Sequence, residues 1–115
     1  MNGTEFVQNG SGENGAGLFV RADADITDAL FQYNQAITSG GGIYVDFAGT
    51  LALTNTRLFS NTAREGGGAY SATGAVLDGG RFEQNRTSGA GGGLYVTQNL
   101  LQNRGTEFVE NVTQE

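Results

Sequence analysis

The chain has 115 residues, enough for one domain, and its hydrophobic content of 37% is low for a compact globule. Six arginines, no lysine and 12 acidic residues give a net charge of -6. Such a chain is a poor ligand for nucleic acid, whose phosphates need cationic partners, and it has no basic patch for an anionic membrane. Without cysteine or histidine it forms no disulfide and lacks the commonest general base and metal ligand.

The start of the chain is not a signal peptide, because residues 1–6 have neither a basic end nor an apolar stretch. No apolar run approaches the roughly 18 residues that a membrane-spanning helix needs. We therefore expect no transmembrane segment in this chain. A bacterial extracellular or cell-surface location is expected, with the export signal outside these residues.

The first expected elements are short strands. Residues 3–9 alternate polar and apolar positions, as a half-buried strand does, and a glycine-rich connector follows. Residues 18–20 form the next strand, and Ala24 and Ile26 alternate with acids in the one after. Residues 30–34 complete this unit.

The following unit has the clearest pattern. Its expected strands cover residues 42–45, 50–54 and 57–61. Later units keep this order, with residues 75–77 and 100–102 in the second strand and 81–83 and 107–109 in the third. No segment has a helical period.

Two motifs recur with one period of about 25 residues. A glycine run precedes an apolar residue at Leu18, Ile43, Ala69 and Leu94, in steps of 25, 26 and 25. A Phe-x-x-Asn motif, with Leu58 replacing Phe once, ends at Asn9, Asn34, Asn61, Asn85 and Asn111, in steps of 25, 27, 24 and 26. Two motifs locked to one period indicate a repeat protein.

Three short strands per unit predict an all-β parallel β-helix of about four rungs, with residues 1–115 as a single segment of a longer or stacked assembly. A hairpin array needs Asn-Gly or Asp-Gly turns in register, and these pairs do not recur in register. A propeller blade needs about 40 residues, and a calcium-binding β-roll needs a nine-residue glycine and aspartate period.

Equivalent residues of successive rungs should lie above one another at about 4.8 Å, the ordinary strand spacing. The interior would then hold three stacks, the first at Leu18, Ile43, Ala69 and Leu94. The second holds Phe6, Phe31, Leu58, Phe82 and Phe108, and the third Ala24, Ile26, Leu51, Leu53, Ala75, Leu77 and Leu101. Glycine at the corners permits positive φ.

The five asparagines, Asn9, Asn34, Asn61, Asn85 and Asn111, are expected to form a structural ladder at a corner. Asparagine tolerates left-handed backbone there, and stacked amides can bond to one another and to the backbone. A site occurs once in a chain, whereas scaffolding occurs in every rung.

Phe19, Tyr44, Tyr70 and Tyr95 form an aromatic column that is a candidate binding face. If Leu18, Ile43 and Leu94 point inward, strand alternation points these rings outward, where they would meet a sugar or a protein. The opposite facing stays open, because Ala69 and Ser71 would leave a thin core.

Four acids are close in sequence, at Asp23, Asp25, Asp28 and Asp46. Asp23 and Asp25 share a strand face about 7 Å apart, so they repel unless an ion joins them, which makes them weak calcium candidates. The alternative is a solvated polar face. A lyase would need a lysine or histidine base, so no catalytic residue and no cofactor is expected.

The pairing of the glycine motif with Phe-x-x-Asn resembles the chlamydial polymorphic outer membrane protein repeat and related bacterial surface repeats. The best match is GGGIYVDFAGTLALTNTRLFSN at residues 40–61, and GGGAY and GGGLY repeat its head. The resemblance implies a right-handed parallel β-helix, often a surface passenger with an adhesive role. It supplies no catalytic residue.

The expected function is therefore a non-enzymatic, structural and adhesive surface segment. Its partners would be adjacent rungs, copies of itself stacked end to end, or a host-surface protein or polysaccharide. Residues 3–7 recur as 105–109 and neither end resembles a cap, which favours stacking. Two alternatives stay open: a self-assembling fibre subunit, and a fragment of a polysaccharide-degrading β-helix, which would need a non-repeating carboxylate cluster with a basic partner.

Overall fold

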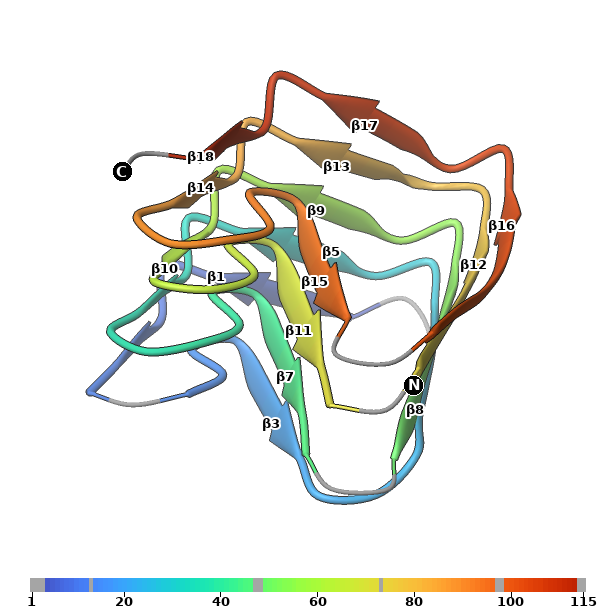
Figure 1. Cartoon of the computed structure of the whole chain (residues 1–115), viewed down its shortest axis with the longest axis horizontal. Helices are drawn as coiled ribbons and strands as arrows, with labels where there is room; N and C mark the ends of the chain where they lie inside the picture. Colours follow the sequence, from blue (N-terminus) through green and yellow to red (C-terminus); the bar gives the residue numbers. More distant parts are fainter. Residues whose placement is uncertain (1–3, 13, 47–48, 73, 97–98, 114–115) are drawn as a thin grey trace.

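The computed structural model describes residues 4–12, 14–46, 49–72, 74–96 and 99–113, and the side chains of these except 99–104 and 113. The chain coils through about four turns, and each strand pairs in parallel with its equivalent one rung away (Figure 1). The predicted fold class, an all-β parallel β-helix, is confirmed.

Within these described ranges the strands form four parallel sheets, named here for what they carry. The tyrosine sheet contains β3 (Leu18–Val20), β7 (Ile43–Val45), β11 (Ala69–Ser71) and β15 (Leu94–Val96). The leucine sheet contains β4 (Ala24–Thr27), β8 (Thr50–Thr54), β12 (Gly74–Asp78) and β16 (Asn99–Arg104). The phenylalanine sheet contains β1 (Glu5–Val7), β5 (Leu30–Gln32), β9 (Arg57–Phe59), β13 (Arg81–Glu83) and β17 (Glu107–Val109). The short sheet contains β2 (Gly10–Ser11), β6 (Gln35–Ala36), β10 (Thr62–Ala63), β14 (Arg86–Thr87) and β18 (Val112–Thr113).

The short sheet corrects the expected number of strands per rung. Three were predicted, whereas a complete rung of the described chain has four. The fourth strand has only two residues, as in Gln35–Ala36 and Thr62–Ala63, and follows each motif asparagine. Two residues are too few to show a period-two pattern, so the sequence placed this segment in a connector.

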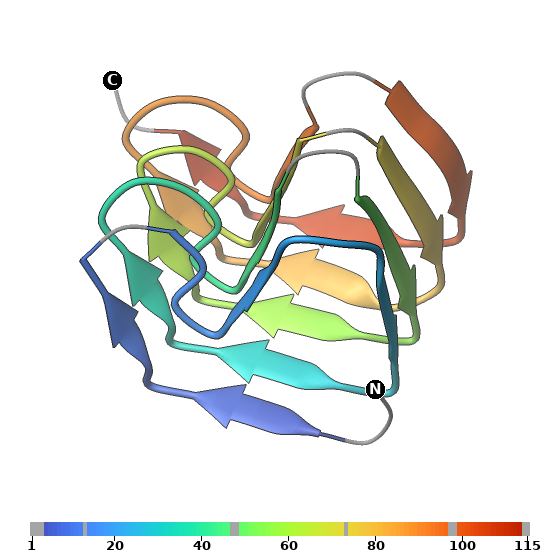
Figure 2. The ribbon, with the colours of Figure 1, turned by 90° about the horizontal axis from the view of Figure 1, so that it is seen from below.

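The pairing register follows the repeat and confirms the predicted stacks over the described side chains. Phe31 pairs with Phe6 and Leu58, and Phe82 pairs with Leu58 and Phe108. Figure 2 shows the rungs one above another, from β1 (blue) at the bottom up to β17 (red). In the leucine sheet Leu100 pairs with Ala75, and the register then shifts. The predicted core position Leu101 has a side chain outside the described part.

The core lies inside the coil and is dry. Its largest fully buried side chains include Phe31, Phe82, Ile43, Leu51 and Leu58, all 0% exposed. Burying an apolar side chain of this size contributes about 1.5–3 kcal/mol. The stacks are therefore what holds successive rungs together, besides the backbone hydrogen bonds of the sheets.

Left-handed backbone marks three corners of each complete rung in the described chain. Glycines fill the first corner at Gly15, Gly40, Gly66 and Gly91, and the second holds Asp28, Asn55, Gly79 and Gly105. The third corner, between the phenylalanine sheet and the short sheet, holds Gln8, Tyr33, Ser60, Gln84 and Glu110, with φ between 53° and 57°. A Cβ on Gly40 would collide with the carbonyl oxygen of Ile43, so no side chain fits there.

The third corner corrects the sequence interpretation of the motif asparagines. They were expected to take the left-handed conformation, but the residue directly before each asparagine takes it instead. This turn directs the asparagine side chain into the coil, where Asn34, Asn61 and Asn85 are 0% exposed. The described ranges contain no helix that is long and apolar enough to span a bilayer.

Candidate functional site

The asparagine column is a continuous hydrogen-bonded ladder inside the third corner. The Nδ2 of Asn61 donates to Oδ1 of Asn85 at 3.0 Å and to the carbonyl oxygen of Phe31 at 2.8 Å. Asn34 donates in the same way to Asn61 and to the carbonyl of Phe6, both at 2.9 Å. The amide nitrogens of Asn34, Asn61 and Asn85 thus each bond one rung forward to an asparagine and one rung back to the backbone.

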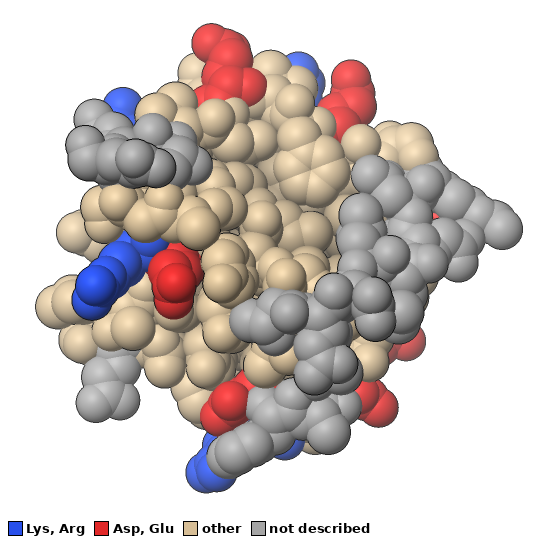
Figure 3. Space-filling model, viewed as in Figure 1, with Lys and Arg blue, Asp and Glu red and all other residues tan. Residues whose placement is uncertain are grey.

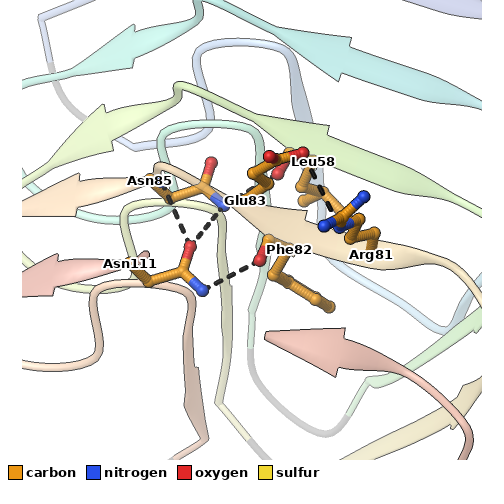
Figure 4. Close-up of polar contacts among 6 residues, drawn as sticks. All are labelled: Leu58, Arg81, Phe82, Glu83, Asn85 and Asn111. Atoms are coloured by element: carbon orange, nitrogen blue, oxygen red, sulfur yellow. Dashed lines mark hydrogen bonds and ion pairs between the residues drawn. The ribbon is translucent and has the colours of Figure 1, made fainter. Parts of the chain in front are cut away.

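The amide oxygens of the ladder are equally occupied. Oδ1 of Asn111 accepts from Nδ2 of Asn85 at 2.9 Å and from the Asn85 backbone nitrogen at 3.1 Å, as Figure 4 shows. In the same view Nδ2 of Asn111 donates to the carbonyl of Phe82 at 2.9 Å. Asn34, Asn61 and Asn85 are fully buried and use both amide hydrogens and the amide oxygen within the ladder, so these three side chains have no polar group left for a ligand.

The aromatic column stands on the outer surface of the tyrosine sheet. Ile43 and Ala69 on its strands are fully buried, whereas Phe19 is 44% exposed and the tyrosines are half-buried. The register places Phe19 beside Tyr44, Tyr44 beside Tyr70, and Tyr70 beside Tyr95. The rings therefore face outward, and Ser71 turns its hydroxyl inward, where it donates to the carbonyl of Gly74 at 2.6 Å.

The rings of this column are stacked face to face. Neighbouring centroids lie 4.9–5.1 Å apart, with interplanar angles of 5–14°. Each inner ring therefore has both faces covered by its neighbours. A sugar that stacks on an aromatic face has no access to Tyr44 or Tyr70, so the column presents ring edges and phenol hydroxyls to a partner.

The pKa values of the two inner phenol groups of the column, on Tyr44 and Tyr70, are raised. Burial raises the pKa of the Tyr44 hydroxyl, and the nearby Asp46 and Tyr70 raise it further. Burial, then Glu65 and Tyr95, likewise raise the pKa of Tyr70. Tyr44 donates to Oδ1 of Asp46 at 3.4 Å. Tyr44 and Tyr70 thus present neutral hydroxyls that can donate and accept hydrogen bonds.

The four acids singled out in the sequence take separate positions. Oδ1 of Asp23 accepts from the backbone nitrogen of Thr50 at 2.8 Å, which joins two rungs. Asp25 points outward from β4, and Asp28 occupies a left-handed corner. Asp46 lies beside Tyr44. Among the described residues no group of three or more acidic side chains is placed to hold a metal ion.

A groove that the sequence did not reveal lies on the outside of the third corner. Its volume is about 520 Å³, and its lining residues are Ser60, Thr62, Gln84, Arg86, Glu110 and Val112. They are the left-handed corner residues and the first residues of the short strands in three successive rungs. Their types differ from rung to rung, so no motif marked them. The sequence signal that could have located the groove is position, because each lining residue directly precedes or directly follows a motif asparagine.

Charged side chains of the described residues form no large patch of one sign on the face shown in Figure 3. Arginines (blue) and acids (red) occur there in small groups, several of them side by side, and most of the remaining described surface is uncharged. One ion pair joins Arg81 and Glu83 at 3.7 Å on β13. No cationic surface gathers in this view that would attract phosphates.

Comparison with known protein families gives a match over a short stretch of the chain. Residues 28–46 match the family model of the Chlamydia polymorphic membrane protein (Chlamydia_PMP) repeat. This stretch runs from the second Phe-x-x-Asn motif through the first full glycine motif to Asp46. No curated protein and no solved structure matches the chain. The match and the coil together show a β-helix protein with a repeat of this kind, which confirms the resemblance seen in the sequence.

Proposed function

We propose that the chain is a segment of a β-helix exposed on a bacterial surface, where it is structural and adhesive and catalyses no reaction. The matching repeat is named for a membrane protein of Chlamydia, which supports a location at the cell envelope. The rungs of residues 1–115 would be one segment of a longer or stacked assembly, with adjacent rungs as its first partners.

The observation that carries the adhesive proposal is the outward aromatic column. Ordinary surface rings are scattered singly, whereas Phe19, Tyr44, Tyr70 and Tyr95 form one continuous strip across four rungs. Contiguous exposed aromatic surface indicates an interaction site. Tyrosine also combines a large contact area with a hydroxyl and loses little conformational entropy on binding. A host-surface protein that meets ring edges and hydroxyls is the partner best suited to this strip.

The absence of catalysis is part of the proposal, and it is supported by the kinds of residues that the chain provides. The sequence has neither histidine nor lysine to act as a base. Glycoside hydrolysis needs two carboxylic groups across one bond. The described acids Asp23 and Asp46 instead bond to Thr50 and Tyr44.

Adhesion of coated beads to epithelial cells tests the proposal. Beads that carry the purified chain should be retained, and a triple variant with Tyr44, Tyr70 and Tyr95 changed to phenylalanine should lose most of that retention. This variant keeps the stack and removes only the hydroxyls. Thr54→Val, which removes a hydroxyl from the outer side of the leucine sheet, is the matched control and should be retained as well as the wild type. Retention no greater than that of bare beads would contradict the adhesive proposal.

Self-association end to end is a second proposal, and the terminal strands support it. Among the described strands β1 and β17 are the two edges of the phenylalanine sheet, so each has one unpaired side. Phe108 on β17 is 44% exposed, although its equivalent Phe82 is fully buried. A further rung or a second copy would cover both the edge and the ring.

A further inference from the structure

The groove at the third corner has the dimensions and lining of a ligand site. Its volume of about 520 Å³ falls among those of small-molecule sites, roughly 300–1,000 Å³. It crosses three rungs, so its length is about 10 Å at the strand spacing. The lining provides hydroxyls from Ser60 and Thr62, an amide from Gln84, a guanidinium from Arg86 and a carboxylate from Glu110.

The two columns that line the groove continue one rung toward the N-terminus. Tyr33 precedes Ser60 in the corner column, because its backbone nitrogen donates to Phe59 in the same way that Ser60 donates to Glu83. Gln35 pairs with Thr62 in the short sheet. The register thus adds an aromatic ring and a second amide at that end of the groove.

Tyr33 differs from the rings of the aromatic column because no ring of the described residues stacks face to face upon it. It is 50% exposed, and its contact with Phe59 is edge to face, with centroids 6.0 Å apart and planes at 81°. Such an exposed ring can receive the apolar face of a sugar, which Tyr44 and Tyr70 cannot because both of their faces are covered.

The chemistry of the groove selects among classes of ligand. An extended peptide adds to a sheet through free backbone groups at a strand edge, but this groove runs across β10, β14 and β18, which pair with one another, and of its lining only Val112 lies on an edge strand of the described sheet. An anionic polysaccharide would meet Glu110 and a chain of net charge -6. What remains is a neutral ligand with many hydroxyls, which accept from Arg86 and Gln84 and donate to Glu110 and the amide oxygen of Gln84.

We propose that this groove binds a neutral oligosaccharide, with one sugar ring on Tyr33 and the next units along Thr62, Gln84 and Arg86. The inference rests on the proposed adhesive function, which it deepens by naming a ligand class and a surface separate from the aromatic column. Glu110 is the only carboxylate in the groove lining, so the groove binds the chain of sugars without cleaving it.

Direct binding by the purified 115-residue chain tests the inference. The probes are cellotetraose, chitotetraose and mannotetraose, with tetragalacturonate as the acidic comparison, and binding is followed by calorimetry and by amide NMR shifts. At least one neutral probe should bind and shift the resonances of Ser60, Gln84 and Tyr33. Thr62→Val and Arg86→Gln should each weaken that binding about fivefold to tenfold, the effect of one lost hydrogen bond. Tyr33→Asn, which tolerates the left-handed backbone, should weaken it by more.

Matched substitutions on other strands separate loss of binding from loss of fold. Thr54→Val and Arg57→Gln make the same chemical changes outside the groove and should leave the affinity unchanged. Thermal unfolding of every variant should show an intact chain. Three results would each overturn the inference: no neutral probe binds at millimolar concentration, tetragalacturonate binds better than all of them, or the groove variants bind like their controls. Bead adhesion that depends on the tyrosine hydroxyls would still support the adhesive function in those cases.

Discussion

The ladder position of each rung requires asparagine because the side chain there must both donate and accept hydrogen bonds. Asn61 donates two hydrogen bonds, to Asn85 and Phe31, and its oxygen accepts from the nitrogen atoms of Asn34. An ionised aspartate has the same size but can only accept hydrogen bonds, and the side chain of alanine can neither donate nor accept one. The ladder therefore depends on the amide itself, repeated in register.

Asn61→Ala should lower the free energy of unfolding by about 1–3 kcal/mol, because it leaves the carbonyl of Phe31 and the amide groups of neighbouring asparagines without partners in a buried place. Urea unfolding followed by circular dichroism measures the change. Gln35→Ala, at an exposed strand position, is the control and should change stability by less than about 0.5 kcal/mol. A stable Asn61→Ala chain that has lost adhesion would contradict the structural role of the ladder.

Backbone conformation at the third corner provides a second residue-scale prediction. Gln84 has φ of 53°, which costs a residue with a side chain roughly 1–2 kcal/mol relative to its usual conformations. Glycine carries no such cost but loses about 0.5–1 kcal/mol of backbone entropy. Gln84→Gly should therefore raise the unfolding free energy by up to about 1 kcal/mol.

Gln35 offers the matched control, because it is also an exposed glutamine but lies in β6. Gln35→Gly should lower the unfolding free energy by about 0.5–1 kcal/mol. Opposite signs for the two glycine variants in thermal or urea unfolding would support the corner geometry, and equal destabilisation would oppose it.

At the scale of the element, the stacked side chains of the phenylalanine sheet contribute the largest buried residues of the core, Phe31 and Phe82. Phe82 lies between Leu58 and Phe108, and its ring is stacked on that of Phe108 with centroids 4.8 Å apart. Phe82→Ala should cost about 3–5 kcal/mol, from lost burial and the cavity left behind. Phe108→Ala, in the same stack but 44% exposed, should cost clearly less. Urea unfolding distinguishes the two, and an unchanged midpoint for Phe82→Ala would show that the inward face is misassigned.

The tyrosine stack should make the protein sensitive to alkali. Burial raises the pKa of Tyr44 and Tyr70 above the ordinary value of 10.0, so the folded chain holds these protons more tightly than the unfolded chain. This contribution to stability is complete below pH 10 and is lost as pH rises through the folded pKa values. A Tyr44→Phe, Tyr70→Phe variant should show a smaller decline in melting temperature between pH 9 and pH 11. An identical decline in both chains would exclude these hydroxyls as its source.

The sequence predicted the fold of these elements well, because the same side-chain types recur with the register of the rungs. Phe82 and Ile43 could be assigned inward from period and alternation alone. The two-residue strands could not, since no alternation fits into Thr62–Ala63. The position with left-handed backbone at the third corner was misassigned because its residue type varies, as in Gln8, Tyr33 and Ser60. These residues share only a positive φ, which the sequence does not display. The groove was missed for the same reason, because its lining is defined by place and not by residue type.

For the whole molecule, we expect the isolated 115-residue chain to associate end to end. The edge strands of the described sheets favour pairing, whereas the net charge of -6 opposes the approach of two copies. Salt screens that repulsion, because the Debye length falls from about 10 Å at 0.1 M to about 3 Å at 1 M. The mass measured by light scattering should therefore rise with salt and with protein concentration. A 12 kDa particle under all conditions would contradict the stacking proposal.

The register that the described rungs share, interrupted in the leucine sheet between β12 and β16, also affects how such a chain can change over generations. Removing residues 43–68 would join Gly42 to Ala69, and this junction restores the order of a glycine before the apolar residue of the tyrosine sheet. The asparagine ladder would close from Asn34 to Asn85, because every rung presents the same donors and acceptors. Unequal recombination between repeats in the gene would then shorten or lengthen the protein by whole turns and still yield a chain that folds. The number of rungs, and with it the distance that the molecule reaches, is thus open to selection without change to any residue.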